Sequence, residues 1–148
     1  MATVHDVAAY ILSKQSPMSA MKLQKLVYYA QAWSLVWDDA PLFSERIEAW
    51  ANGPVVYELY NRHRGQFAVA RWDGNMDALT PVQQETVDSV LQFYGDKSPQ
   101  WLSDLTHMER PWKSARGNLP DGERCDNEIT LESMAEYYSS LPPSSQTA

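Results

Sequence analysis

The clearest pairing of chemically useful side chains in the sequence is Asp104 with His107. Residues three positions apart on a helix share one face and can touch. A carboxylate that orients an imidazole can serve general-base catalysis, for example in a cleft shared with Glu109 or Arg110. However, the sequence places no Ser, Cys or second carboxylate to complete such a site. We therefore expect a structural or partner-contact role for His107, and a small hydrolase or transferase using His107 and Asp104 remains the alternative.

Other chemistry is weakly supported by the sequence. The three histidines, His5, His63 and His107, lie far apart and show no metal-ligand spacing. The single cysteine, Cys125, has acidic neighbours, which disfavour a reactive thiolate. Neither a phosphate-binding P-loop nor a dinucleotide-binding glycine motif occurs. We expect no metal, no cofactor and no catalytic residue, and therefore a binding protein.

Composition limits the partners of this protein. The 148 residues suit one domain, and the net charge of -7 disfavours binding to nucleic-acid phosphates. The sequence lacks an apolar run of membrane-spanning length and a signal-peptide pattern, so we expect a cytoplasmic location and no membrane contact. Six Trp, eight Tyr and three Phe should fill the core first and could also serve at an interface.

The elements around these residues are predicted mainly from hydrophobic spacing. A helix over about 19–37 carries one apolar stripe and should be the central, aromatic-rich helix. Its polar side chains are concentrated in its first half, which predicts an amphipathic start. We assign to the structural core Leu23, Leu26, Val27, Ala30, Trp33, Trp37 and Pro54.

The remaining pattern predicts a mainly α fold, with about six helices and a small β-hairpin near 41–50. Pro54 suits the first position of a helix, and Pro111 is expected to end one. We expect loops over 66–78 and 112–128, one compact domain over 1–140 and a flexible tail over 141–148. The other helices are expected over 4–14, over 54–63, from Thr80 to Gly95, from Ser98 to Pro111 and from Thr130 to about Tyr138.

Several segments together carry a family resemblance. The runs KLQKLVYYAQAWSL (22–35), PLF (41–43) and EAWANGPVVYELY (48–60) resemble the Panacea antitoxin domain, which includes SocA-like adaptors and GepA-type phage-associated proteins. LTHMERPW (105–112) is similar to a later segment of that family, and the resemblance extends over roughly 4–140.

The resemblance implies a helical antitoxin of a toxin-antitoxin pair that neutralises its cognate toxin by direct binding. One branch of the family acts as a proteolytic adaptor that delivers the toxin to ClpXP, so ClpX is a second possible partner. A phage-encoded effector that binds an unrelated host protein also remains open. We expect the partner surface on the exposed fringe of the motif and on later aromatic or histidine positions, namely Tyr29, Asn52, Tyr57, Arg62, His107 and Trp112.

Overall fold

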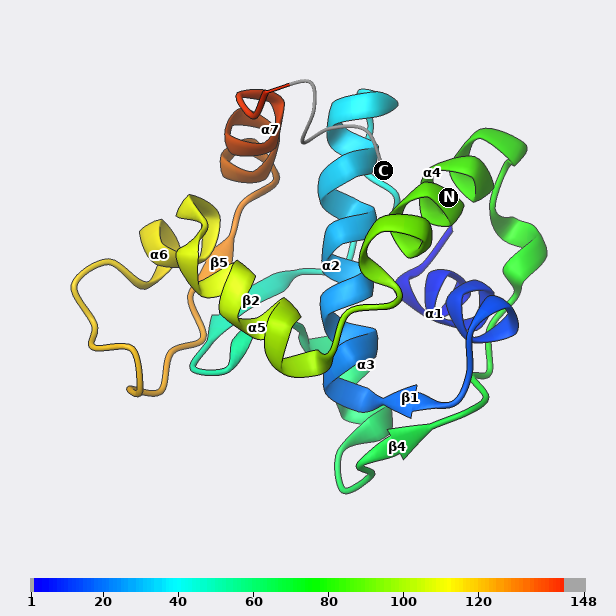
Figure 1. Cartoon of the computed structure of the whole chain (residues 1–148), viewed down its shortest axis with the longest axis horizontal. Coiled ribbons are helices and arrows are strands. Elements are labelled where there is room, and N and C mark those ends of the chain that lie inside the picture. The colour runs from blue at the N-terminus through cyan, green and yellow to red at the C-terminus, as the bar shows by residue number, and fades with distance from the viewer. Residues whose placement is uncertain (1, 143–148) are drawn as a thin grey trace.

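The fold is mainly α-helical, as the sequence predicts. The computed structural model describes residues 2–142, so most of the tail expected over 141–148 lies outside the described residues. Within that part, six α-helices and two small antiparallel sheets surround a seventh helix, α2 (Ala20–Trp37), which runs through the middle of the molecule (Figure 1). Helices α4 and α7, strand β3 and helix α5 all pack against α2.

Most helices begin where the sequence places a capping side chain. Thr3, Ser19, Thr80, Ser98 and Thr130 each accept a hydrogen bond from a backbone N–H in the first turn of a helix. These caps satisfy N–H groups that have no partner inside the helix. The helices besides α2 are α1 (Val4–Lys14), α3 (Tyr57–His63), α4 (Pro81–Tyr94), α5 (Pro99–Met108), α6 (Arg110–Arg116) and α7 (Leu131–Ser139), with a 3₁₀ turn at Met76–Ala78.

The hairpin lies later in the chain than predicted. Strand β2 (Ile47–Trp50) pairs with β3 (Gly53–Val56) on one side and with β5 (Glu128–Ile129) on the other. Leu42 and Phe43, expected to form a strand, are buried without belonging to either sheet. A second, two-stranded sheet joins β1 (Met18–Ser19) to β4 (Ala68–Val69) within the region predicted as a loop.

Two prolines lie at other positions in the secondary structure than predicted. Pro54 lies in strand β3 and pairs with Ala49, and helix α3 begins only at Tyr57. Strand β3 is at the edge of its sheet, where a residue without an N–H is tolerated. Pro111 lies in the first turn of α6, where the missing N–H would have no helical partner. The predicted loop therefore begins with a two-turn helix.

The burial of α2 also differs from the amphipathic start predicted for it. Leu23, Leu26, Val27, Ala30 and Trp33 are buried, while Trp37 is half-buried and stacks on Trp33 at 5.1 Å. The polar Gln24, Lys25 and Gln31 are also buried, so the first half of α2 is enclosed on its polar face too.

Two glutamines explain how this polar face can be buried. Gln31 Oε1 accepts hydrogen bonds from the N–H groups of Leu42 and Phe43, and its Nε2 donates to the Phe43 carbonyl at 2.8 Å. Gln24 binds both backbone groups of Val56 in β3 in the same way. Each side-chain amide thus bonds backbone N–H and C=O groups of a neighbouring segment, as the backbone of an adjacent strand would do.

Gln31→Leu should destabilise the protein by about 2–4 kcal/mol, because three buried backbone groups lose their partners. Urea unfolding would measure this change. The matched control is Gln92→Leu on the exposed side of α4, which should change the free energy of unfolding by less than about 0.5 kcal/mol. Equal effects of the two substitutions would contradict the stabilising role of the hydrogen bonds from Gln31 to Leu42 and Phe43.

Candidate functional site

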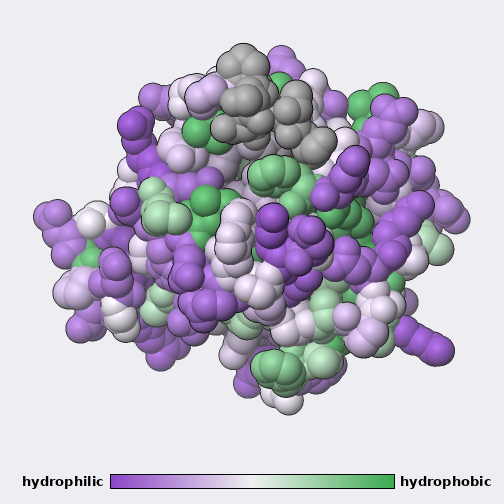
Figure 2. All heavy atoms as spheres, viewed as in Figure 1, coloured by the Kyte–Doolittle hydropathy of each residue, from purple (hydrophilic) through white to green (hydrophobic). Residues whose placement is uncertain are grey.

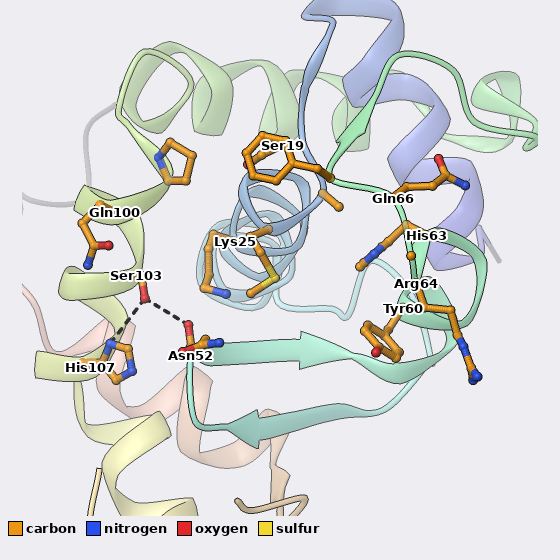
Figure 3. A pocket seen from close by; sticks show the side chains of 15 residues that line it. Ser19, Lys25, Asn52, Tyr60, His63, Arg64, Gln66, Gln100, Ser103 and His107 are labelled. Atoms are coloured by element: carbon orange, nitrogen blue, oxygen red, sulfur yellow. Dashed lines mark hydrogen bonds between the residues drawn. The ribbon is translucent and has the colours of Figure 1, made fainter. Parts of the chain in front are cut away.

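Two adjoining pockets lie around the turn between β2 and β3. The Lys25 pocket has a volume of about 470 Å³ and lies between α2, α3 and α5 (Figure 3). The Trp50 pocket, of about 880 Å³, lies on the other side of the turn. Four residues line both pockets, so they form one continuous hollowed face: Met21, Asn52, Tyr60 and Arg64.

Lys25 lies at the inner wall of the first pocket. Its side chain is 1% exposed, and its ammonium donates one long hydrogen bond, at 3.4 Å, to the Pro54 carbonyl. Burial lowers the pKa of Lys25 to about 7. Gly53 leaves the space that Lys25 occupies, since a Cβ there would come within 2.6 Å of Lys25 Cε.

His63, also on this pocket, is held as one neutral tautomer. The amide orientation of Gln24 is fixed by its two bonds to Val56, so Gln24 Nε2 donates to His63 Nε2 at 2.9 Å. That nitrogen accepts, which places the ring proton on Nδ1. Burial lowers the pKa of His63, and the nearby Lys25 charge lowers it further.

The β2–β3 turn is fastened by four side chains from α5 and α6. They donate hydrogen bonds to four consecutive carbonyls, and a helix pair thereby fixes the wall shared by the two pockets. The pairs are Arg116 to Ala49 at 3.0 Å, Trp112 Nε1 to Trp50 at 2.8 Å, His107 Nε2 to Ala51 at 2.9 Å and Ser103 Oγ to Asn52 at 3.0 Å.

This arrangement leaves the proposed catalytic pair unformed. The Asp104 carboxylate accepts a hydrogen bond from Gln100, and His107 is oriented by a backbone carbonyl instead. Ser103 lies 3.5 Å from His107 Nδ1 but donates its proton to the Asn52 carbonyl. In a catalytic triad the serine would donate to the histidine, and a carboxylate would accept from the other ring nitrogen. Here both Ser103 and His107 donate to backbone carbonyls instead.

Aromatic rings line the Trp50 pocket. The Trp50 and Tyr60 ring centroids are 4.8 Å apart, and Tyr57, which is 42% exposed, lies 6.4 Å from each of them. Phe67, on the wall of the Lys25 pocket, is 85% exposed. Figure 2 shows hydrophobic atoms at the lower edge of the molecule, over the segment between α3 and β4, in a largely hydrophilic surface.

Four of the six predicted partner-binding residues are not buried, and three of these lie on the hollowed face. Asn52 and Tyr57 are exposed on the hollowed face, and His107 is half-buried beside them. Arg62 is exposed outside both pockets and donates to the Asp73 carbonyl.

Tyr29 and Trp112 were wrongly placed on the surface by the prediction. Tyr29 is fully buried, and its ring stacks on Tyr94 with the centroids 4.1 Å apart. Trp112 is 2% exposed, and its Nε1 donates a hydrogen bond to the Trp50 carbonyl. Helices α4 and α7 cover α2 around Tyr29, and hydrophobic spacing along one helix does not predict such a cover.

A buried carboxylate, Glu109, is the partner of Tyr29. Tyr29 and Tyr138 both donate to Glu109 Oε1, at 2.7 and 2.8 Å, and Tyr28 donates in turn to Tyr138. Burial raises the pKa of Glu109 to about 7, although the two tyrosine hydrogen bonds favour the charged form. A glutamate two residues before Pro111, between two helices, was the available sequence signal for this centre.

These features define a class: a small helical domain with a hollowed, aromatic-lined face. Among residues 2–142, no group of three or more His, Cys, Asp or Glu side chains could hold a metal ion, and no helix is long and apolar enough to cross a bilayer. The sequence profile described as "Antitoxin SocA-like, Panacea domain" matches residues 23–113, and the chain belongs to this family. No curated protein and no solved structure matches the chain.

Glu109→Gln should change the pH dependence of stability. The folded state holds a proton on Glu109 up to about pH 7, and the unfolded state loses it near pH 4.5. Stability from this group is therefore present at low pH and lost as pH rises through 7. The variant should match the wild type near pH 4.5 and be about 3 kcal/mol more stable at pH 8, measured by urea unfolding. A difference independent of pH would contradict the buried neutral carboxyl.

Proposed function

We propose that this protein is the antitoxin of a toxin-antitoxin pair and neutralises its toxin by direct binding. Membership of the SocA-like antitoxin family is the observation that carries the proposal. The match includes α2, the β2–β3 hairpin, α3 and the α5–α6 junction, which together build the hollowed face. We also propose that residues 1–140 act as one domain in the cytoplasm.

We assign the toxin-binding surface to this face. It presents Tyr57 and Phe67 to solvent beside two pockets, and exposed aromatic side chains next to concave surface are typical anchors of protein interfaces. The turn between them is held by α5 and α6, so little ordering is required on binding. His107 and Asn52 contribute polar contacts at its centre.

An enzymatic function is less well supported. The residues that would have to cooperate, Asp104 and His107, have separate hydrogen-bond partners, and the family name describes an antitoxin. The net charge of -7 opposes nucleic-acid binding and favours a partner with basic surface.

Steric inhibition and proteolytic adaptation remain two forms of the same proposal. An adaptor shortens the lifetime of the toxin in the cell, whereas a steric inhibitor leaves it bound and intact. Toxin half-life in cells with and without ClpXP, with this protein present, separates them. An effector acting on an unrelated host protein would instead leave the product of the neighbouring gene unbound.

Tyr57→Arg and Phe67→Arg should each weaken binding of the neighbouring gene's product by about thirtyfold or more. Each substitution replaces an aromatic anchor by an arginine whose charge would be buried in the complex. Both side chains are exposed, so thermal stability should hold. Co-purification, titration calorimetry and growth rescue in cells expressing the toxin would measure the effect. The control is Val82→Arg, which changes a 56% exposed residue on α4, away from this face.

Undiminished rescue by both variants would overturn the assignment of the surface. A neighbouring product that is harmless alone, or that remains toxic and uncomplexed beside the wild-type protein, would overturn the antitoxin proposal itself.

A further inference from the structure

The Lys25 pocket has an electrostatic character opposite to that of the chain. The chain carries 19 acidic and 12 basic residues, yet none of the described residues lining this pocket is Asp or Glu. Lys25 and Arg64 line it, together with the imidazoles of His63 and His107. A cavity of this composition attracts anions and repels cations.

Lys25 has unused hydrogen-bonding capacity in this pocket. An ammonium carries three donors, and the single bond to Pro54 is long. Its charge has no carboxylate partner, because the ion pairs of residues 2–142 involve Arg46 and Lys97 only. A buried amine in that position gains from any anion that reaches it.

The surrounding side chains indicate which other groups a ligand of this pocket should carry. Asn52, Gln100 and Ser103 provide polar groups on the pocket wall, and Figure 3 shows Lys25 extending from α2 towards the Asn52 and Ser103 side of the pocket. Met21, Phe67 and Pro99 provide an apolar wall. The volume of about 470 Å³ suits a small ligand with one anionic end and one apolar end.

We propose that this pocket binds a carboxylate group joined to an apolar moiety, with the carboxylate on Lys25 and the apolar part against Met21 and Phe67. The proposal goes beyond toxin neutralisation and does not depend on it. The carboxylate could belong to a free small molecule or to the C-terminus of a peptide, since both present the same group. A phosphate dianion fits less well, because Lys25 is the one buried cation among the described residues lining the pocket, and Arg64 is exposed.

Titration calorimetry with 3-phenylpropionate tests the proposal, with 3-phenylpropionamide as the uncharged analogue of the same shape. The acid should bind and the amide should bind at least about tenfold more weakly, since a charge-assisted hydrogen bond is lost. Inorganic phosphate should not displace the acid. A tripeptide ending in Phe, with a free or amidated C-terminus, distinguishes the two sources of the carboxylate: tighter binding of the free-ended peptide indicates a protein terminus.

Lys25→Met should reduce binding of 3-phenylpropionate by about tenfold or more. The substitution removes a poorly solvated amine and keeps the length of the side chain, so the variant should fold. Lys22→Met is the matched control, because Lys22 lies on the same helix outside the pocket and should leave affinity unchanged. Arg64→Gln provides a second variant at an exposed position, and should weaken binding with no loss of thermal stability.

Proton uptake on binding gives an independent readout. At pH 8 the bound carboxylate should draw a proton onto Lys25, and calorimetry in buffers of different ionisation enthalpy measures it. The other titratable or charged groups facing the pocket are Tyr60 and His63 from α3, Arg64 directly after α3, and His107 from α5. Uptake that persists in Lys25→Met, equal binding of acid and amide, or no binding at 10 mM acid (roughly the weakest measurable fragment affinity) would overturn the proposal.

Discussion

Helix α2 must satisfy its polar side chains inside the protein, because neighbouring elements enclose nearly all of it. Gln24 and Gln31 do so by binding backbone groups of β3 and of the segment around Phe43. Of the two tyrosines in its middle turn, Tyr29 donates to Glu109, and Tyr28 is linked to Glu109 through Tyr138 of α7. Each of these contacts fixes a different part of the chain against α2, so the packing of the domain depends on how a buried polar helix is satisfied.

The same constraint explains where the pockets lie. Lys25 is the one member of this polar set whose donors remain largely unused, and it lies beside the β2–β3 turn. Helices α5 and α6 hold that turn through its carbonyls, and α3 carries the aromatic rings beyond it. The hollowed face is therefore built from elements that also stabilise the core.

Sequence reasoning identified the elements with strong local signals. Hydrophobic spacing located α1, α2, α4, α5 and α7, each of which starts at a capping threonine or serine, and the fold class followed from the number of helices. It misplaced Pro54 and Pro111, because a proline is compatible with both an edge strand and a first helical turn. It also predicted an amphipathic start for α2, where Gln24 and Gln31 are in fact buried, and it treated Tyr29 and Trp112 as surface anchors. Their partners lie far away in sequence, and helical spacing carries no information about such contacts.

Hydrogen–deuterium exchange of the protein alone and in complex with the neighbouring gene's product tests the central claim most directly. Binding through the hollowed face predicts slower exchange at the β2–β3 turn, α3 and residues 64–67, with α1 and α4 unchanged. Protection confined to α1 and α4, with the turn and α3 unaffected, would contradict this account of the binding surface.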